Sequence, residues 1–388
     1  MRTSGMVRQF HQNAMRILIT NNRLDYRGGA ESFVGDLARG LQAEGHQVMA
    51  YSSDPGRRPR MLEHDAIPVT TDPLALPFKP DIIHAQHHLD AMTAIASLPG
   101  VPAIYHCHGA VWKECVPIHP RIRHYLAMSS FLRERMVVER NIAPDKIDVL
   151  HNSVDTARFR TVCTPPPSIS RALFYNGSHL PGGSTTEAVS RACTSLGIHL
   201  DFIGKYFSRS VPDPENVLHG YDLVFASGRS AIDALASGCA VIVLGRNSCG
   251  PLVCVDNFSA LRDSNFSIAA NCPPPDPANV IESIRSYDPA QAAAVTARTR
   301  DEADSKRMVA RLLPLYQRVI DDHRGRPTDP AAEATALANY LRELTPVIKI
   351  VDDMQRRQNM PLSIVEAHRT LDLHLDAMQR TPPPPLRG

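Results

Sequence analysis

The stretch NNRLDYRGGAESFVGDLARGLQAEGHQV, residues 21–48, decides the fold class, because it places two glycines between a strand-like run and a helix-like run. The apolar run RILIT precedes it at 16–20, and QVMAYSS at 47–53 overlaps its end. Two β-rich runs around one helical run are typical of a βαβ unit with parallel strands. Gly28 and Gly29 have two explanations, a tight turn that needs φ above zero or a bare backbone at a helix N-terminus that binds an anion.

The alternation of strand-like and helix-like runs continues to residue 245. Further strands are expected at 81–86, 102–109, 124–129, 146–152, 171–177, 199–204, 222–227 and 239–245. Helices are expected at 30–43, 88–97, 130–140, 184–196 and 229–237. Because most of these strands are apolar on both faces, we expect parallel sheets that are covered by helices on both sides.

A proline-rich stretch, TVCTPPPSIS at 161–170, interrupts the alternation and has the composition of a stiff connector. We therefore expect an α/β protein with two Rossmann-like doubly wound domains at 15–162 and 171–325, joined by a linker at 163–170. Residues 289–324 are predicted to form one or two long helices. Two such domains that face each other leave a cleft at the carboxyl ends of their strands, where ligands bind.

Both ends of the chain are expected to lie outside these domains. Residues 1–14 are predicted to be a disordered extension, and Met15 is an alternative start. Residues 326–388 are predicted to be a helical tail with a disordered end, in which Pro346 begins a new helix capped by Thr345. Apolar residues recur at four-three spacing in this tail, at Leu337, Leu341, Leu344, Ile348 and Val351 and again, with one histidine, at Ile364, His368, Leu371, Leu375 and Met378. They indicate either amphipathic helices on the body or a helical homodimer seam.

Composition argues against several classes of function. In 388 residues, 42 basic side chains balance 40 acidic ones, so no nucleic-acid partner is expected. The first 15 residues lack the apolar core of a signal peptide, and no apolar run reaches transmembrane length. The 8 cysteines contain no C-x-x-C pair and are expected to be reduced thiols of a cytoplasmic protein.

Histidines gather where two expected strands end. His84 and His87 stand at the end of one strand, and His106 and His108 lie two residues apart at the end of the next. Three interpretations are open: hydrogen-bonded core histidines, a metal site, or groups that bind a sugar or a phosphate. Their position favours a sugar or a phosphate. Because no carboxylate pair and no helical ligand spacing accompany them, we expect no metal.

The second domain contains two candidate phosphate-binding turns. In SGRSAIDALASG at 227–238, Arg229 and Ser230 begin a helix, and a cation in the first turn opposes the helix dipole, which indicates a bound anion. Asp233 lies one turn later, so the alternative is an exposed Arg229–Asp233 ion pair. Gly250, in NSCGPLV, stands at another expected strand-to-helix junction.

Several motifs, taken in order, make the chain similar to a known family. They are MRILITNN at 15–22, RGGAESFVGDLARGLQAEGHQV at 27–48, KPDIIHAQ at 79–86, VPAIYHCHG at 101–109, AMSSFLRERM at 127–136, NIAPDKIDVLHNSVDTARF at 141–159 and DLVFASGRSAIDALASGCAVIVLG at 222–245. Through them the chain resembles a family 4-type glycosyltransferase of the GT-B class, in which two Rossmann-like domains face each other. The resemblance covers roughly residues 15–325.

The resemblance implies a metal-independent, retaining transfer of a sugar from a nucleotide-diphosphate sugar. That donor is a substrate, so no cofactor is expected. His108 matches the histidine beside the transferred sugar and is the expected catalytic residue. The expected donor-binding residues are Gly28, Gly29, Arg229, Ser230, Asp233 and Gly250, with Asp233 on the ribose. The expected sugar-side or acceptor-side residues are His84, His87, His106 and Asn152.

Two features depart from the family pattern. Phe225 stands eight residues before Asp233, where the family has the first Glu of its Glu-x7-Glu motif. The family's Arg and Lys pair on the donor diphosphate is also missing, so Arg229, with Lys205 as a second candidate, would replace it. These departures keep two alternatives open. One is a catalytically impaired pseudoenzyme that acts as a binding partner, and the other is a nucleotide-sugar epimerase of the same fold.

The sequence leaves three classes of acceptor open: a glycan, a lipid-linked molecule or a small molecule. A lipid-linked acceptor would bring peripheral membrane contact, although no basic amphipathic helix points strongly to a membrane surface.

Overall fold

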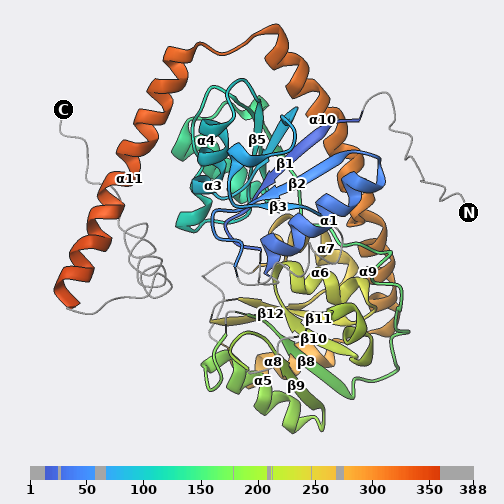
Figure 1. Cartoon of the computed structure of the whole chain (residues 1–388). Helices are drawn as coiled ribbons and strands as arrows, with labels where there is room; N and C mark the ends of the chain where they lie inside the picture. Colours follow the sequence, from blue (N-terminus) through green and yellow to red (C-terminus); the bar gives the residue numbers. More distant parts are fainter. Residues whose placement is uncertain are drawn as a thin grey trace, which may run out of the picture.

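The computed structural model describes residues 14–24, 28–56, 67–177, 179–207, 211, 213–245, 247–267 and 275–358. Within them the chain forms two α/β domains, each with its own sheet, and C-terminal helices follow (Figure 1). The predicted fold class is confirmed. Nearly all of the expected N-terminal extension and the second apolar series of the tail lie outside the described residues.

The first sheet has seven strands in the order β3-β2-β1-β4-β5-β6-β7, and every neighbouring pair is parallel. Its strands are β1 (Arg16–Thr20), β2 (Gln47–Tyr51), β3 (Val69–Thr70), β4 (Ile82–Ala85), β5 (Ala103–Cys107), β6 (Ile122–Ala127) and β7 (Ile147–Val149). Its helices are α1 (Gly29–Ala43), α3 (His88–Ser97) and α4 (Ser130–Arg140), joined by the much later α10 (Ser305–Gly325).

Both faces of this sheet carry a core. Ile17 and Ile19 of β1 pack with residues of α1 and α10, whereas Leu18 packs on the other face with residues of α3 and α4. Successive side chains of a strand point to opposite faces, so a sheet covered on both sides needs strands that are apolar throughout.

The second sheet has five strands in the order β12-β11-β10-β8-β9. Its strands are β8 (Arg171–Tyr175), β9 (His199–Ile203), β10 (Leu223–Ala226), β11 (Ala240–Gly245) and β12 (Ser248–Leu252). Its helices are α5 (Ser184–Ser195), α6 (Gly228–Ala236), α7 (Val255–Asp263), α8 (Pro277–Arg285) and α9 (Pro289–Glu302).

The edge strand β12 corrects one sequence expectation. It pairs antiparallel with β11, and Gly250 and Pro251 lie inside it rather than in a strand-to-helix turn. Proline has no N–H to donate, but an edge strand has one unpaired side and accommodates it. The expected phosphate turn at Gly250 is therefore wrong.

The ends of several helices follow from local sequence. Asp276, Asp288 and Asp304 cap α8, α9 and α10 by accepting a backbone N–H two residues later, at 2.9, 2.8 and 2.7 Å. Ser129 caps α4, and Asn141 ends it in the left-handed region at φ 51°. Each is a residue type preferred at that position.

The chain crosses between the domains twice, and the two crossings lie side by side. Val154 pairs with Asp304 in a parallel bridge, and its N–H donates to the Ala303 carbonyl at 2.8 Å. After this second crossing α10 returns to the first domain, where Met308 and Tyr316 are buried in its core. This packing differs from the expected division, in which residues 171–325 form the second domain.

The tail begins with one long helix, α11 (Pro330–Gln358). Its first part docks on the first domain, where Leu337 and Tyr340 pack against the core that contains α3 and α4. Pro346 lies inside the helix, and Thr345 donates its hydroxyl to the Leu341 carbonyl at 2.8 Å instead of capping a new helix. The predicted helix start at Pro346 is wrong, because one missing N–H is tolerated when the turns on both sides continue. In the part of the chain that the structure describes, no helix is long and apolar enough to cross a membrane.

Candidate functional site

The starts of α1 and α6, one from each domain, lie against each other. A Cβ built on Gly29 would lie 3.7 Å from the Cβ of Arg229. Neither helix is capped by the side chain of its N-cap residue, Gly28 for α1 and Ser227 for α6. Uncapped helix starts carry backbone N–H groups and a partial positive charge. Together they form a place that favours an anion.

Backbone strain and crowding do not explain the glycine pair. Gly28 has an ordinary φ of −87°, and Gly29 is exposed and not among the residues with positive φ. The 3.7 Å contact from Gly29 to Arg229 is one that an alanine would also make. The tight-turn explanation with positive φ is therefore wrong, whereas Gly228 does adopt φ +57°. An exposed backbone at the start of α1 is the remaining explanation.

Arg229 is buried and bridges the two domains. Its Nε donates to Asp233 Oδ1 at 2.8 Å within α6, and its Nη2 donates to Asp36 Oδ2 of α1 at 2.5 Å. The expected Arg229–Asp233 ion pair exists, but it is buried rather than exposed, with 4% and 6% of the two side chains accessible. The third nitrogen, Nη1, is buried without a protein partner.

Asp36 has three cationic neighbours. Besides Arg229, it forms an ion pair with Arg39, and Arg158 Nη1 lies 3.7 Å from its Oδ1. Its own side chain is fully buried. Burial alone would raise the pKa of Asp36, but the three guanidinium groups outweigh it and hold this pKa below its usual range. Asp36 is therefore ionised and compensated at the domain interface.

Three of the four expected histidines form one cluster beside α1. The rings of His106 and His108 lie 4.2 Å apart and those of His84 and His106 lie 5.7 Å apart, measured between centroids. Phe33, one turn after Gly29, contacts His106 and His108 at 4.8 and 4.9 Å. His84 Nδ1 lies 2.6 Å from the hydroxyl of Tyr316 on α10.

Burial keeps these imidazoles neutral. It lowers the pKa of His106 to about 3 and the pKa values of His84 and His108 well below the ordinary histidine value. His108 Nε2 is buried and has no protein partner. A neutral imidazole carries one donor and one acceptor, so His108 has a ring nitrogen available to hydrogen bond a ligand.

The remaining expected residues lie outside this cluster. His87 faces Glu114, and its ring is 6.5 Å from that of His108. Asn152 donates to Asn265 Oδ1 at 2.8 Å across the domain interface. Ser230 follows Arg229 in the first turn of α6. Lys205 is exposed and lies over the ring of Tyr206.

The sequence analysis did not identify three buried carboxylates near the site. Asp36 lies on the apolar face of α1, three residues after Phe33, and this position was a usable signal. Glu31, in the first turn of α1, is buried, and burial raises its pKa. Glu114 comes from a short 3-10 turn at Trp112–Glu114, and nothing in the local pattern marks it.

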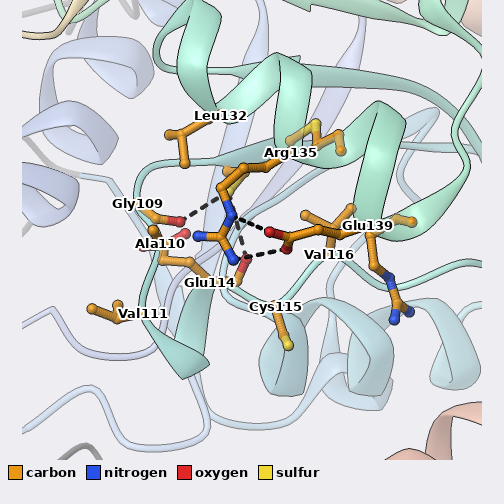
Figure 2. A pocket seen from close by; sticks show the side chains of 12 residues that line it. Gly109, Ala110, Val111, Glu114, Cys115, Val116, Leu132, Arg135 and Glu139 are labelled. Carbon is orange, nitrogen blue, oxygen red and sulfur yellow. Dashed lines mark hydrogen bonds and ion pairs between the residues drawn. The ribbon is translucent and has the colours of Figure 1, made fainter. Parts of the chain in front are cut away.

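A cavity of about 200 Å³ adjoins Glu114 and Arg135 (Figure 2). Gly109, Glu114 and the α4 residues Leu132 and Arg135 are among its walls. Arg135 is occupied by a two-pronged pair with Glu139, with both N···O distances at 2.7 Å. This guanidinium is held by Glu139, and the cavity is not part of the proposed donor site.

Among the described residues, no group of three or more His, Cys, Asp or Glu side chains has the geometry to hold a metal ion. The described neighbours of the histidine cluster include Phe33 and Tyr316.

Comparison with known proteins identifies what the chain is similar to in sequence and in fold. Residues 27–158 match the model of Glycosyltransferase Family 4. A glycosyltransferase from Rickettsia africae is 14% identical, with 79% of this chain and 99% of that chain covered and a TM-score of 0.57. Anabaena Alr3699/HepE, solved in complex with UDP-glucose, is 14% identical, with 78% and 99% covered and a TM-score of 0.57. No curated protein matches the chain in sequence. The chain therefore has the GT-B fold of glycosyltransferases, and residues 27–158 of its first domain are similar to the Glycosyltransferase Family 4 model.

Proposed function

We propose that the protein transfers a glycosyl group from a nucleoside-diphosphate sugar to an acceptor hydroxyl. The bond between the anomeric carbon and the diphosphate oxygen breaks, a bond to the acceptor oxygen forms, and the acceptor proton passes to the departing diphosphate. The observation that carries the proposal is the meeting of two uncapped helix starts, at Gly28–Gly29 and Gly228–Arg229, from opposite domains. This is the charge distribution that a leaving diphosphate requires.

The donor diphosphate would bind along the exposed start of α1 and the start of α6. Gly29 offers its backbone without a side chain, and Arg229 Nη1 is the guanidinium nitrogen that has no protein partner. Asp233 would accept hydrogen bonds from the ribose. Anabaena HepE, of similar fold, has been solved with UDP-glucose, which supports a nucleotide sugar as the donor class.

His108 would contact the transferred sugar. It is neutral, belongs to the cluster beside α1 and has an unpartnered Nε2. The proposed transfer retains the anomeric configuration, as the family resemblance implies. In this proposal no metal takes part. The two helix starts supply partial positive charge to the diphosphate, and Arg229 Nη1 supplies a hydrogen-bond donor. The acceptor is a glycan, a lipid-linked molecule or a small molecule.

The alternative of an impaired enzyme keeps its motivation, because the first Glu of the family's Glu-x7-Glu motif is missing. Phe225, which stands in its place, is fully buried inside β10, in a cluster with Phe174 and Ile242. Its side chain points into the core and offers no group to a donor. The epimerase alternative gains an observation, since Glu31 and Glu114 are buried near His87.

A screen of UDP-, TDP-, GDP- and ADP-sugars without acceptor tests the proposal. A glycosyltransferase is expected to release nucleoside diphosphate and free sugar slowly from one of them. Proton NMR of the first sugar released reports the anomeric configuration. Conversion of the nucleotide sugar into its epimer would instead establish the epimerase. Failure of every nucleoside diphosphate to bind in calorimetry would contradict both.

Arg229→Ala is expected to weaken binding of that nucleotide sugar by roughly ten- to a hundredfold, the equivalent of about 1.5–3 kcal/mol. Arg39 and Arg158 remain to compensate Asp36, whereas buried Asp233 loses its guanidinium partner, so circular dichroism first checks that the variant is folded. Arg229→Lys keeps the charge but loses the planar fork and should give an intermediate loss. Arg171→Ala, at the first residue of β8, is the matched control. Calorimetric titration makes the comparison, and equal affinities would confine Arg229 to a structural role.

A further inference from the structure

Glu114 is a loop carboxylate with an unusual position. It ends the 3-10 turn Trp112–Glu114 between β5 and β6, and only 3% of its side chain is accessible. Burial of a carboxylate costs several kcal/mol unless partners compensate it, so the contacts of Glu114 show what the fold uses it for.

Both carboxylate oxygens of Glu114 have partners at strand ends. Oε2 accepts the backbone N–H of His108 at 3.0 Å. Oε1 lies 3.0 Å from Nε2 of His87. Burial alone would raise the pKa of Glu114, but His87 and the His108 N–H outweigh it and hold the pKa below its usual range. The group is therefore an ionised acceptor with both oxygens in use.

His87 lies between Asn22 and Glu114. Its Nδ1 accepts the backbone N–H of Asn22 at 3.0 Å, and its Nε2 lies 3.0 Å from Glu114 Oε1. His87 also has φ 53°, a left-handed conformation that costs a non-glycine residue of order 1 kcal/mol or more. The two contacts hold this conformation in place.

These contacts connect the ends of three parallel strands. Asn22 follows β1, His87 follows β4, and His108 follows β5, and Glu114 completes the chain of contacts between them. Cys107 adds a clip, since its thiol donates to the Gly109 carbonyl at 3.2 Å. The Glu114 carboxylate therefore helps the sheet to hold the backbone at His108 in place.

We propose that Glu114 is a positioning residue for His108 and holds its backbone so that the imidazole faces the transferred sugar. The proposal rests on the proposed function, in which His108 contacts that sugar. Misplacement of a catalytic group by about 1 Å costs on the order of a hundredfold in rate. Loss of the Glu114 anchor should therefore reduce turnover without removing any group that binds the nucleotide.

Glu114→Gln is the first test. The amide has one acceptor oxygen for two N–H groups, so one anchor contact is lost while the volume is kept. With the nucleotide sugar that the wild type hydrolyses fastest, kcat is expected to fall at least tenfold and KM to change less than twofold. Glu114→Asp, which keeps the charge, should recover part of the loss. Glu139→Gln, a half-exposed glutamate on α4 that pairs with Arg135, is the matched control and should change neither constant.

A second readout needs no turnover. In ¹⁵N-labelled protein, the His108 amide proton and the His87 ring nitrogens report the Glu114 contacts directly. Glu114→Gln should shift the His108 amide and change the His87 ring signals, while the control leaves both in place. If Glu114→Gln fails to fold, Glu114→Asp is measured in the same way.

The outcomes separate the two proposals. Unchanged kcat in folded Glu114→Gln, or unchanged His108 and His87 signals, would overturn the positioning role. A wild type that turns over no nucleotide sugar while the signals shift as expected would contradict the proposed function and retain the anchor. Equal losses of kcat and nucleotide affinity would also overturn the positioning role, because they would place Glu114 in donor binding.

Discussion

Burial shifts the pKa values of several single residues in this protein. His84, His106 and His108 share one cluster, and burial lowers the pKa of each. Glu31 behaves in the opposite sense, because burial raises its pKa. All four changes favour the neutral form, which suits groups that hydrogen bond a sugar rather than an ion.

This pattern predicts a pH dependence of stability. The unfolded chain takes up a proton at each histidine near pH 6.5, whereas folded His106, with its pKa at about 3, excludes it. Stability is therefore fully present above pH 6.5 and is lost as the pH falls below it. For His106 alone the loss between pH 6.5 and 5 is about 2 kcal/mol. Glu31 acts in the opposite direction, because its protonation favours the folded state.

Thermal denaturation of wild type and His106→Leu from pH 7.5 to 5 checks this prediction. The variant should lose less stability than the wild type over this range, and the exposed His199→Gln should behave as the wild type. Parallel curves for His106→Leu and wild type would show that His106 is not held neutral.

At the scale of elements, the two helices that start at the domain interface lack a side-chain cap, as do α3 and α5 elsewhere in the protein. Asp or Ser side chains cap α4, α8, α9 and α10, but Gly28 and Ser227 leave α1 and α6 uncapped. An uncapped helix start lowers the free energy of unfolding by on the order of 1 kcal/mol. The two adjacent uncapped starts of α1 and α6 therefore lower the stability of the domain interface.

A pair of glycine variants tests what these starts are for. Gly29→Ala fits the ordinary backbone and the 3.7 Å contact, so the free energy of unfolding should stay equal or rise by up to about 1 kcal/mol. Binding of the nucleoside diphosphate should weaken, because the new methyl group covers the helix start. Gly228→Ala makes only ordinary contacts, with Asn265 at 3.7 and 3.9 Å, but must adopt φ +57°, so it should destabilise the protein by roughly 1–2 kcal/mol. Denaturant unfolding and calorimetry separate the two effects, and a Gly29→Ala variant with full affinity would contradict the anion role.

At the scale of the whole molecule, charged groups join the two domains. Asp36 of the first domain meets Arg229 of the second, and Arg158 contacts both Asp36 and Glu215. Ser130 donates to Asp263 at 2.7 Å at another point of the same interface. The hydrophobic cores stay separate, so the interface rests largely on polar contacts, which favour relative motion of domains.

Asp36→Asn is predicted to loosen this interface. The amide keeps the size of the side chain but leaves Arg229, Arg39 and Arg158 without their shared carboxylate. Removal of one partner from a buried ion pair costs up to roughly 3–5 kcal/mol. The three arginines keep Asp233, Asp155 and Glu215 as second partners, so the loss is expected at or below the lower end of this range. The radius of gyration from X-ray scattering should rise, whereas the exposed Asp145→Asn should leave it unchanged. A compact Asp36→Asn variant of wild-type stability would show that other contacts hold the domains together.

The sequence by itself determined the elements, because their physical causes are local. Strands such as β4 and β5 are mostly apolar runs in the sequence, and α3 and α4 begin and end at the expected residues. The glycine pair and the histidines at strand ends were also readable, since both depend on the position within one βαβ unit.

Only the tertiary structure decided which distant groups meet. Nothing local indicates that α10 returns to the first domain, that Asp36 binds Arg229, or that Glu114 anchors His108. These contacts join residues that are far apart in the chain or lie in irregular turns. These contacts stabilise the protein because they pair buried charges and bury apolar surface. Which groups are paired depends on the residues that the fold brings together, not on neighbours in the sequence.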